Sequence, residues 1–297
     1  LSSTKAAAVF WQSRQGRRAI RLTAVWIIAV LAMLYTLFPI YWVVVAALDP
    51  IGNLATQKLL PQRAGLGNFQ FLFQDPSYPF PRWMINSIKV STTAGIISVC
   101  LTTISAYAFS RFRFRGRRAL MKGIVLIQVF PNMLALVSLY LIVQQIGRFL
   151  PLFGLDTHGS LILVYLGGVL GGNVWLMKGY IDTIPKELDE SAMIDGASPW
   201  QIFWRLIFPL IRPMLAVILV LSFVGTYGDI ILARVLLKAN EQLTVAVGLW
   251  NFGASWQSPQ RWGPFSAGAL IAALPALVLF YSLQDWLVTG LTSGAVK

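Results

Sequence analysis

Long apolar runs that carry few charges recur from one end of the chain to the other, and they limit what it can fold into. Hydrophobic residues make up 57% of the 297 residues and charged residues only 12%, too little polar surface to cover a water-soluble fold. Six runs are long enough to cross a bilayer as helices, namely 22 to 48, 84 to 110, 119 to 146, 160 to 180, 213 to 237 and 263 to 290. Because backbone amides inside a bilayer need internal partners, and no alternating strand pattern indicates a barrel, the sequence predicts an all-α membrane protein with six transmembrane helices.

The basic residues are distributed unequally over the segments that connect these runs. Counted over alternate segments, sixteen of the 24 Lys and Arg residues fall on the side that contains both chain ends, seven fall on the other side, and Lys89 lies inside a run. Since Lys and Arg accumulate on the cytoplasmic side, both termini are predicted to be cytoplasmic. Residues 1 to 21 would then be a cytoplasmic segment, 22 to 290 a single membrane domain, and 291 to 297 a cytoplasmic tail. The first run is too long for a signal-peptide core, so we interpret it as a retained anchor.

A formal net charge of +13 would also suit a protein that binds nucleic acid. The densest basic segment, Arg111 to Lys122, nevertheless joins the second and third apolar runs and contains Phe112 and Phe114. Anionic headgroups attract a basic segment in that position, and aromatic side chains favour the membrane interface. We therefore expect membrane lipid, and no nucleic acid, as the partner of this segment.

The sequence contains no pattern typical of a cofactor site. The run from Gly167 to Gly172 places small residues four apart, which favours close packing of two helices. A phosphate-binding loop would need Gly-x-x-x-x-Gly-Lys-Ser/Thr after a strand, and that order does not occur. Cys100 is the one cysteine and has no His or second Cys beside it, so no metal site is predicted.

The segment from 181 to 212 is the longest connection on the predicted cytoplasmic side, and acidic residues cluster in it. Two short helices are predicted there. Pro185 suits the first position of one helix, the acidic residues after it complement the helix dipole, and Gly196 suits its end. Ser198 is predicted to start the second helix, with Gln201 completing a capping box. An apolar face follows at helical spacing, formed by Trp200, Phe203, Ile207 and Leu210, and periodicity alone does not decide whether it meets the membrane or a protein groove.

The same loop resembles the Glu-Ala-Ala loop of permease subunits in ATP-binding-cassette (ABC) importers. That family has Glu-Ala-Ala, three residues, Gly, nine residues, and then Ile-x-Leu-Pro. The spacing is kept here, with matching residues Glu190, Ser191, Ala192, Gly196, Leu206, Phe208 and Pro209. Three of these depart from the pattern, since Ser191 replaces Ala, Leu206 replaces Ile and Phe208 replaces Leu.

The resemblance implies that the loop is a coupling helix that docks into a cleft of a separate ATPase subunit. An ordinary amphipathic connector is the alternative. The residues expected to carry the coupling are Glu190, Ser191, Ala192, Asp195, Gly196, Phe203, Leu206 and Pro209.

The resemblance covers nearly the whole chain and is closest to the MalG-type subunit of maltose and maltodextrin importers. It implies the type I ABC importer permease fold in the cell inner membrane, with maltose or maltodextrin as the first expected cargo and trehalose as the next. Implied partners are a second permease of the MalF type, a homodimeric ATPase of the MalK type and an extracytoplasmic sugar-binding protein. The ATPase would use ATP and Mg²⁺, so this chain would bind no cofactor and would not itself be an enzyme. The C-terminal residues Thr292, Ser293 and Gly294 resemble tails that reach into the ATPase dimer, with a disordered tail as the alternative.

Polar and aromatic residues at membrane depth are candidates for the sugar path, because sugars need ring faces and hydroxyl partners. The candidates are Asp229, Tyr227, Thr226, Asn132 and Asn173. Asp229 is favoured because a carboxylate inside a membrane is costly unless it faces a cavity or a partner, and pairing with Arg234 is the structural alternative. In MalG-type systems, however, sugar contacts lie mainly in the partner permease.

Two rival classes of membrane protein fit the sequence less well than the importer permease. A membrane-embedded transferase would need acidic or His residues clustered at one membrane face, and the acidic cluster present is the one in the 181 to 212 loop. A secondary transporter would need inverted repeats with broken helices and several buried charges, and neither is visible in the sequence.

Overall fold

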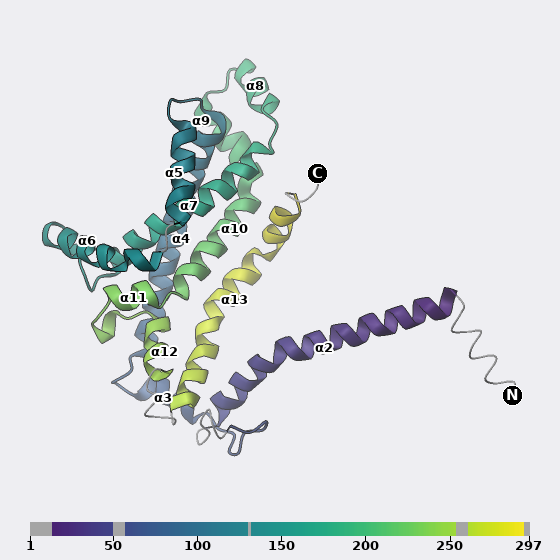
Figure 1. Cartoon of the computed structure of the whole chain (residues 1–297), viewed down its shortest axis with the longest axis vertical. Helices are drawn as coiled ribbons and strands as arrows, with labels where there is room; N and C mark the ends of the chain where they lie inside the picture. Colours follow the sequence, from purple (N-terminus) through teal and green to yellow (C-terminus); the bar gives the residue numbers. More distant parts are fainter. Residues whose placement is uncertain (1–13, 50–56, 130–131, 254–260, 294–297) are drawn as a thin grey trace. The chain divides into compact units, whose positions relative to one another are not determined.

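The computed structural model describes residues 14–49, 57–129, 132–253 and 261–293, and every regular element within these ranges is helical (Figure 1). The chain divides into two compact units. The first contains residues 1–69 and 258–267, and the second contains residues 70–257 and 268–297. Two helices, α3 (Gly67–Gln74) and α13 (Trp262–Ser293), begin in the first unit and continue into the second.

The first unit consists mainly of α2 (Arg14–Leu48) and the segment that closes its C-terminal end. Every side chain from Arg21 to Tyr41 is exposed, although most are apolar, as expected for a helix surrounded by lipid. The last carbonyls of α2 find partners nearby. The Asn68 side-chain amide donates to the carbonyl oxygen of Ala47 at 3.0 Å, and the Gly65 N–H donates to that of Leu48 at 2.9 Å. These bonds satisfy backbone acceptors that a helix end otherwise leaves free.

Three helices form the centre of the second unit, α4 (Phe80–Arg111), α7 (His158–Asp182) and α10 (Phe208–Tyr227), and they pack side by side (Figure 1). Small residues permit this close packing. A Cβ on Gly95 would lie 3.3 Å from the Leu219 side chain, so α4 and α10 approach closely there.

The two ends of this bundle are held by different segments. At one end, the Trp83 indole N–H donates to the Asn240 carbonyl at 2.7 Å, and His158 Nε2 lies 3.0 Å from the Gln242 carbonyl. At the other end, the Ser110 hydroxyl donates to Asp182 at 2.6 Å. The N-terminal ends of α4 and α7 thus lie together, and the two helices run parallel. His158, the first residue of α7, thus holds η4 (Asn240–Gln242) against this end of the bundle.

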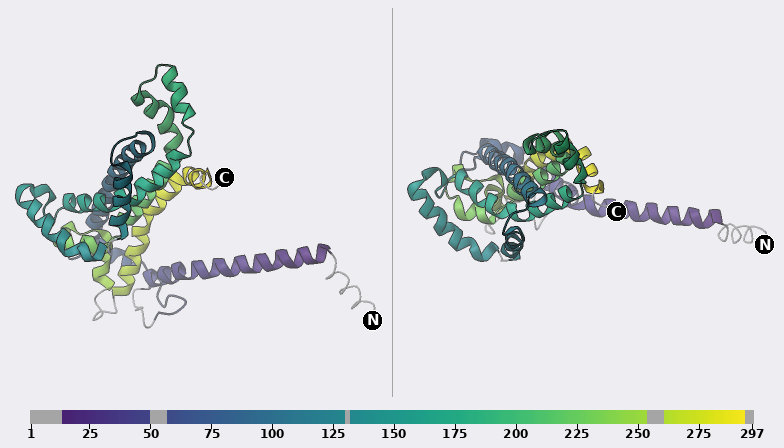
Figure 2. Two further views of the ribbon diagram at one scale, coloured as in Figure 1. Left: turned by 45° about the horizontal axis from the view of Figure 1, so that its top comes forward. Right: turned by 90° about the horizontal axis from the view of Figure 1, so that it is seen from above.

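Because α4 and α7 are parallel, the chain between them has to return along the bundle. It does so in three pieces, α5 (Arg117–Val129), η1 (Asn132–Ala135) and α6 (Leu136–Phe149). The helix α6 lies to one side of the three central helices (Figure 1, Figure 2). The run predicted as one span over 119 to 146 is thus made of three pieces, and whether they cross a membrane as one span stays a prediction. Pro131, which lies outside the described residues, has no N–H with which to continue a helix.

The bounds predicted for the fifth span, 213 to 237, differ from the observed helix at both ends. Its helix starts earlier, because α9 (Pro199–Gln201) and the π-helical segment η3 (Ile202–Ile207) run without a break into α10. It ends earlier at Tyr227, where Gly228 is the C-cap, and the short helix α11 (Ile231–Leu236) follows separately. The remaining elements are η2 (Pro151–Phe153), η4 (Asn240–Gln242) and α12 (Val245–Gly253).

Within the described residues, four helices are long and apolar enough to cross a membrane. A fifth is added if the two halves of α7, inclined by 50°, count as one span. The shorter α6 is apolar but has only 14 residues. Helix length alone therefore supports a multi-pass arrangement and leaves six crossings as a prediction.

The glycine run in α7 packs differently from the expectation. A Cβ on Gly171 would lie 2.3 Å from Nε2 of Gln128, whereas a Cβ on Gly167 or Gly168 would meet nothing within 4 Å. One glycine thus accommodates a side chain of α5, and the expected close approach of two helix backbones is not seen at the first two.

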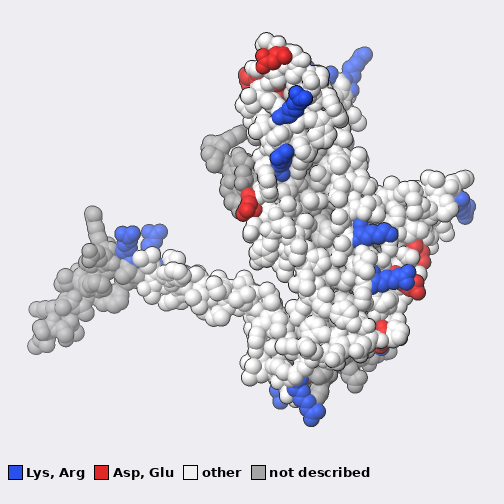
Figure 3. Space-filling model, turned by 180° about the vertical axis from the view of Figure 1, so that it is seen from behind, with Lys and Arg blue, Asp and Glu red and all other residues white. Residues whose placement is uncertain are grey.

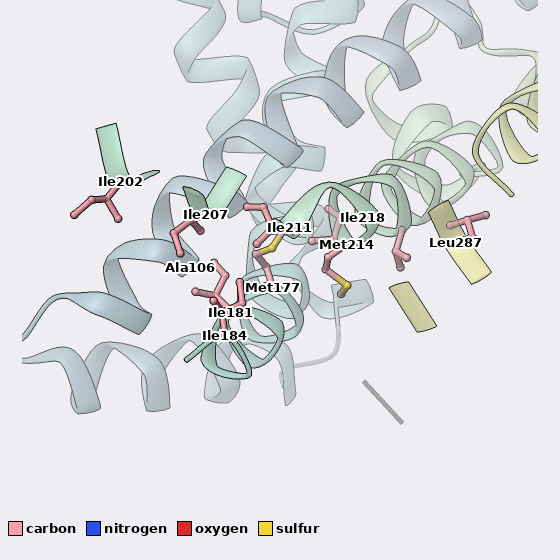
Figure 4. Packing of buried hydrophobic residues seen from close by; sticks show 11 residues of the cluster. Ala106, Met177, Ile181, Ile184, Ile202, Ile207, Ile211, Met214, Ile218 and Leu287 are labelled. Atoms are coloured by element: carbon pink, nitrogen blue, oxygen red, sulfur yellow. The ribbon is translucent and has the colours of Figure 1, made fainter. Parts of the chain in front are cut away.

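A cluster of buried apolar side chains connects the spans to the 181 to 212 loop (Figure 4). Its members come from α4, α7, η3, α10, α13 and the residues after α7, and they are Ala106, Met177, Ile181, Ile184, Ile202, Ile207, Ile211, Met214, Val217, Ile218 and Leu287. Because interiors packed this closely deform little, a displacement of the loop is transmitted to the helices that share the cluster.

Candidate coupling site

The first half of the candidate loop is α8 (Glu187–Ile194). Glu187, Asp189 and Glu190 lie in its first turn, where negative charge is favoured by the helix dipole. Pro185 was expected at the first helical position and instead precedes the helix, because Lys186 is the N-cap. The acidic residues therefore start the helix without help from a proline or a capping side chain.

The end of α8 is a Schellman motif centred on Gly196. The Gly196 N–H donates to the Met193 carbonyl at 3.0 Å, and the Ala197 N–H donates to the Ala192 carbonyl at 2.9 Å. Gly196 has φ of +83°, a left-handed conformation that favours glycine. The prediction that Gly196 ends this helix is confirmed.

The second half begins with the predicted capping box. The Gln201 N–H donates to Ser198 Oγ at 3.3 Å, and the Ser198 N–H donates to Gln201 Oε1 at 2.8 Å. Pro199 occupies the first position, where its missing N–H costs nothing. This part of the prediction is confirmed, but the helix does not stop after a few turns.

A π-helical segment carries the loop into the membrane span. The Phe208 N–H donates to the Phe203 carbonyl, five residues earlier, just before Pro209. A wider turn there accommodates a proline that cannot donate to the preceding turn. Because α9, η3 and α10 are one continuous run from Pro199 to Tyr227, the loop is joined rigidly to a span.

The predicted apolar face is only partly buried. Phe203 and Ile207 are buried, whereas Trp200 is 70% exposed and Leu210 is also exposed. On α8, the last residue Ile194 is 87% exposed. The end of the loop therefore presents large apolar side chains to its surroundings, in addition to the exposed Glu190, Ser191, Asp195, Gly196 and Pro209.

A shallow pocket lies between α8 and η3. Ala192 and Leu206, both partly buried, are in its wall, which puts four of the predicted coupling residues around one depression. The pocket is lined by Ala192, Asp195, Gly196, Ala197, Gln201, Ile202, Arg205 and Leu206. Acidic and basic side chains lie at this end of the second unit, and others lie further down the same face (Figure 3).

An ion pair that was not predicted joins the loop to the end of α4. Arg111 Nε lies 2.6 Å from Asp189 Oδ2, and both side chains are buried. Burial raises the pKa of the Asp189 carboxyl above its ordinary value, and the Arg111 guanidinium opposes that rise. The sequence marked Arg111 as part of a basic run and Asp189 as part of an acidic cluster, but nothing in it indicated that the two meet.

The candidate path residues at the end of α10 all have partners within the chain. Tyr165 donates its hydroxyl to Asp229 Oδ2 at 2.9 Å, and the Ala233 N–H donates to the same oxygen at 3.0 Å. In the described part of the chain, no ion pair joins Asp229 to Arg234. Thr226 is buried and donates to the Ser222 carbonyl of its own helix at 2.8 Å.

Tyr227 and Asn173 take part in helix packing. The Tyr227 ring stacks on Phe223 with centroids 5.2 Å apart. The Asn173 amide donates to Ser222 Oγ at 3.1 Å, and that hydroxyl lies 3.4 Å from Ser98 Oγ, so a polar chain joins α7, α10 and α4. Asn132 begins η1, and its side chain lies outside the described residues.

The predicted tail residues lie at the limit of the described chain. The helix α13 ends at Ser293, so Thr292 and Ser293 belong to its last turn, and their side chains are outside the described part. Gly294 lies outside the described residues altogether.

Comparison with solved structures places this fold among importers. A bacterial ABC transporter that imports the acidic polysaccharide alginate matches with a TM-score of 0.71 and 22% identity, over 93% of this chain and 98% of that one. A second structure, of a bacterial alginate ABC transporter with a periplasmic protein bound to an alginate pentasaccharide, matches with a TM-score of 0.66 and 21% identity, over 92% and 96% of the two chains. The chain therefore has the ABC importer permease fold.

Relatives found by sequence comparison have higher identity to this chain than these structures have. The permease protein MalG of the maltose/maltodextrin transport system of Vibrio vulnificus strain YJ016 is 39% identical over 272 residues, which is 88% of this chain and 90% of that protein. MalG of Escherichia coli strain K12 is 39% identical over 274 residues, with the same coverage. A family model described as "Binding-protein-dependent transport system inner membrane component" matches residues 98–293, which include α7 to α13 and the whole candidate loop. The chain thus belongs to the family of binding-protein-dependent transport system inner membrane components and is related to its MalG-type permeases.

Proposed function

We propose that this chain is one of two permease subunits of an ATP-driven importer for maltose or maltodextrins, with trehalose as the next candidate cargo. The support for the cargo is 39% identity to MalG proteins of maltose/maltodextrin transport systems over 88% of the chain. Family membership also favours this function over the transferase and the secondary transporter considered from the sequence. No further observation favours either rival.

The proposed membrane arrangement has six crossings with both termini in the cytoplasm. In this arrangement α5, η1 and α6 together make the third crossing, because the parallel α4 and α7 require the chain to return between them. The end of the second unit that carries α8 then faces the cytoplasm, in agreement with the basic residues after α4. Residues 1 to 21 and 291 to 297 flank the membrane domain, and the basic segment after Arg111 meets anionic lipid headgroups.

The loop from 181 to 212 is proposed to dock on the ATPase as a coupling helix. The observation that carries this proposal is a short helix, α8, capped by a left-handed glycine and followed by a helix that runs unbroken into a span. Such a unit transmits displacement as a rigid lever. Its contact surface would include Glu190, Ser191, Ala192, Asp195, Gly196, Leu206 and Pro209. The buried Phe203 would pack beneath that surface.

The proposed assembly contains a second permease of the MalF type, a homodimeric ATPase of the MalK type and an extracytoplasmic sugar-binding protein. The family's dependence on a binding protein supports the last of these. The ATPase supplies the ATP and Mg²⁺ chemistry. Thr292, Ser293 and Gly294 are proposed to reach the ATPase dimer. Of the path candidates, Asp229 is the best supported, because it is only half-buried and Tyr165 fixes its orientation.

Sugar-stimulated ATP hydrolysis by the complex reconstituted in lipid vesicles tests this function. We expect Glu190→Lys and Gly196→Trp to abolish the stimulation, because each places a mismatched side chain on the docking surface. Glu241→Lys and Gly116→Trp are matched controls. Glu241 is exposed at the other end of the unit, and Gly116 has φ of +88° with open space around it. Stimulation that survives in the Glu190 and Gly196 variants would remove the coupling role.

A further inference from the structure

The last turn of α4 contacts both halves of the candidate loop and the end of α7. Its residues Tyr107, Ser110 and Arg111 lie three and four positions apart and therefore on one face of the helix. Arg111 contacts α8 through Asp189, and Ser110 donates to Asp182 at the end of α7. One helical turn is thus connected to three other segments.

Arg111 makes two of these contacts at once. Besides the 2.6 Å approach of Nε to Asp189 Oδ2, its Nη2 donates to the Ile184 carbonyl at 3.0 Å. The two side chains are only 6% and 9% exposed. A single guanidinium therefore holds α8 and the loop that leads into it, which uses the planar, forked geometry that Arg has and Lys lacks.

Tyr107 extends the connection to the second half of the loop. Its ring lies against Phe203 of η3, with centroids 4.9 Å apart. The buried apolar cluster continues from there through Ala106, Ile207 and Ile211. The end of α4 is therefore fixed to the coupling loop by charge on one side and by apolar packing on the other.

Burying an ion pair is an expensive way to stabilise a fold, since desolvation offsets much of the attraction. An exposed pair such as Arg82–Glu241, with side chains 55% and 66% exposed, avoids that cost. Buried charge pairs do fix one relative position of two elements, because any shift leaves both charges desolvated and unpaired. The geometry here fits such a positioning role.

We propose that Arg111 and Asp189 are positioning residues that lock α8 to the end of α4, so that the ATPase moves α4 together with α10. This inference rests on the proposed coupling function. With the lock in place, displacement of α8 reaches the bundle by two routes, the continuous η3–α10 helix and the ion pair to α4. Without the ion pair, ATP hydrolysis proceeds, but apolar packing alone holds α4 to the loop, so α4 follows α8 less closely and less sugar moves per ATP.

The test is the ratio of sugar taken up to ATP hydrolysed by the whole complex in vesicles, for Asp189→Asn, Arg111→Gln and the charge swap Arg111→Asp with Asp189→Arg. We expect each single variant to lower the ratio about tenfold, within the usual range of coupling energies, and the swap to restore part of it. Glu241→Gln, which breaks the exposed pair, is the matched control and keeps the wild-type ratio. A ratio that stays at the wild-type value in both single variants would overturn the proposal.

Two further measurements separate positioning from folding and from the proposed function. Arg111→Lys keeps the charge but cannot hold Asp189 and Ile184 together, so we expect a lowered ratio with a normal yield of assembled complex. An unchanged ratio in Arg111→Lys contradicts the proposal even if the other variants fail to assemble. If the wild-type complex shows no sugar-stimulated hydrolysis, the proposed function itself fails. If the wild type is stimulated and the variants keep its ratio, only the lock is refuted.

Discussion

Gly196 and Gly116 form a matched pair, because both have a left-handed backbone and a Cβ at either would meet nothing within 4 Å. We predict that Gly196→Ala and Gly116→Ala cost a similar strain, about 1 to 2 kcal/mol each. Only Gly196→Ala should lower sugar-stimulated ATP hydrolysis, because it distorts the end of α8. The assay is hydrolysis by the reconstituted complex, with thermal unfolding measured alongside. Equal loss of stimulation in both variants would mean that strain alone is responsible.

At Gly248, a neighbouring side chain, and not the backbone conformation, leaves no room for a larger residue. A Cβ there would lie 2.2 Å from the Trp83 ring, which is buried and held by its bond to Asn240. We predict that Gly248→Ala destabilises the protein by about 1 to 3 kcal/mol through overpacking. Thermal unfolding in detergent should show a lower Tm. Gly225→Ala is the control, since that helical glycine has open space around it, and a Tm equally lowered there would count against the packing explanation.

The capping box is an element-scale feature with its own test. Removing the Ser198 hydroxyl leaves the Gln201 N–H without its partner, at a cost of about 1 kcal/mol. We predict that Ser198→Ala speeds amide hydrogen exchange over α9 and η3 and leaves α8 unchanged. Ser191→Ala, an exposed change within α8, is the control. If Ser198→Ala leaves exchange in α9 and η3 at the wild-type rate, the cap does not stabilise the start of the lever.

Caps and long apolar runs could be predicted from the sequence because their causes are local. The bounds of α2, α4, α7 and α13 include the four runs predicted there. The Ser198–Gln201 capping box and the helix end at Gly196 were also located correctly. Each depends on residues within one helical turn or on continuous hydrophobicity.

What could not be predicted depends on residues far apart in the chain or on cooperative backbone adjustment. The Arg111–Asp189 contact joins residues 78 positions apart, and no local pattern specifies it. The π-helical turn before Pro209 shifts the side chains that follow it, so Leu210 is exposed although the ideal helical spacing put it on one face with Phe203 and Ile207.

For the whole molecule, the central claim is that the ATPase binds the end of the second unit that α8 forms. Ile194 is the most exposed large apolar side chain of that helix, and Leu152, 70% exposed, lies near the opposite end of the unit. These two positions therefore allow the claim to be tested at both ends of the second unit within one assembled complex.

The most direct measurement places a photo-reactive benzoylphenylalanine at Ile194 or at Leu152 and irradiates membranes that contain the complete complex. The account predicts a cross-link from position 194 to the ATPase subunit and none from position 152. No cross-link to the ATPase from position 194, or a cross-link to it from position 152, would contradict the account.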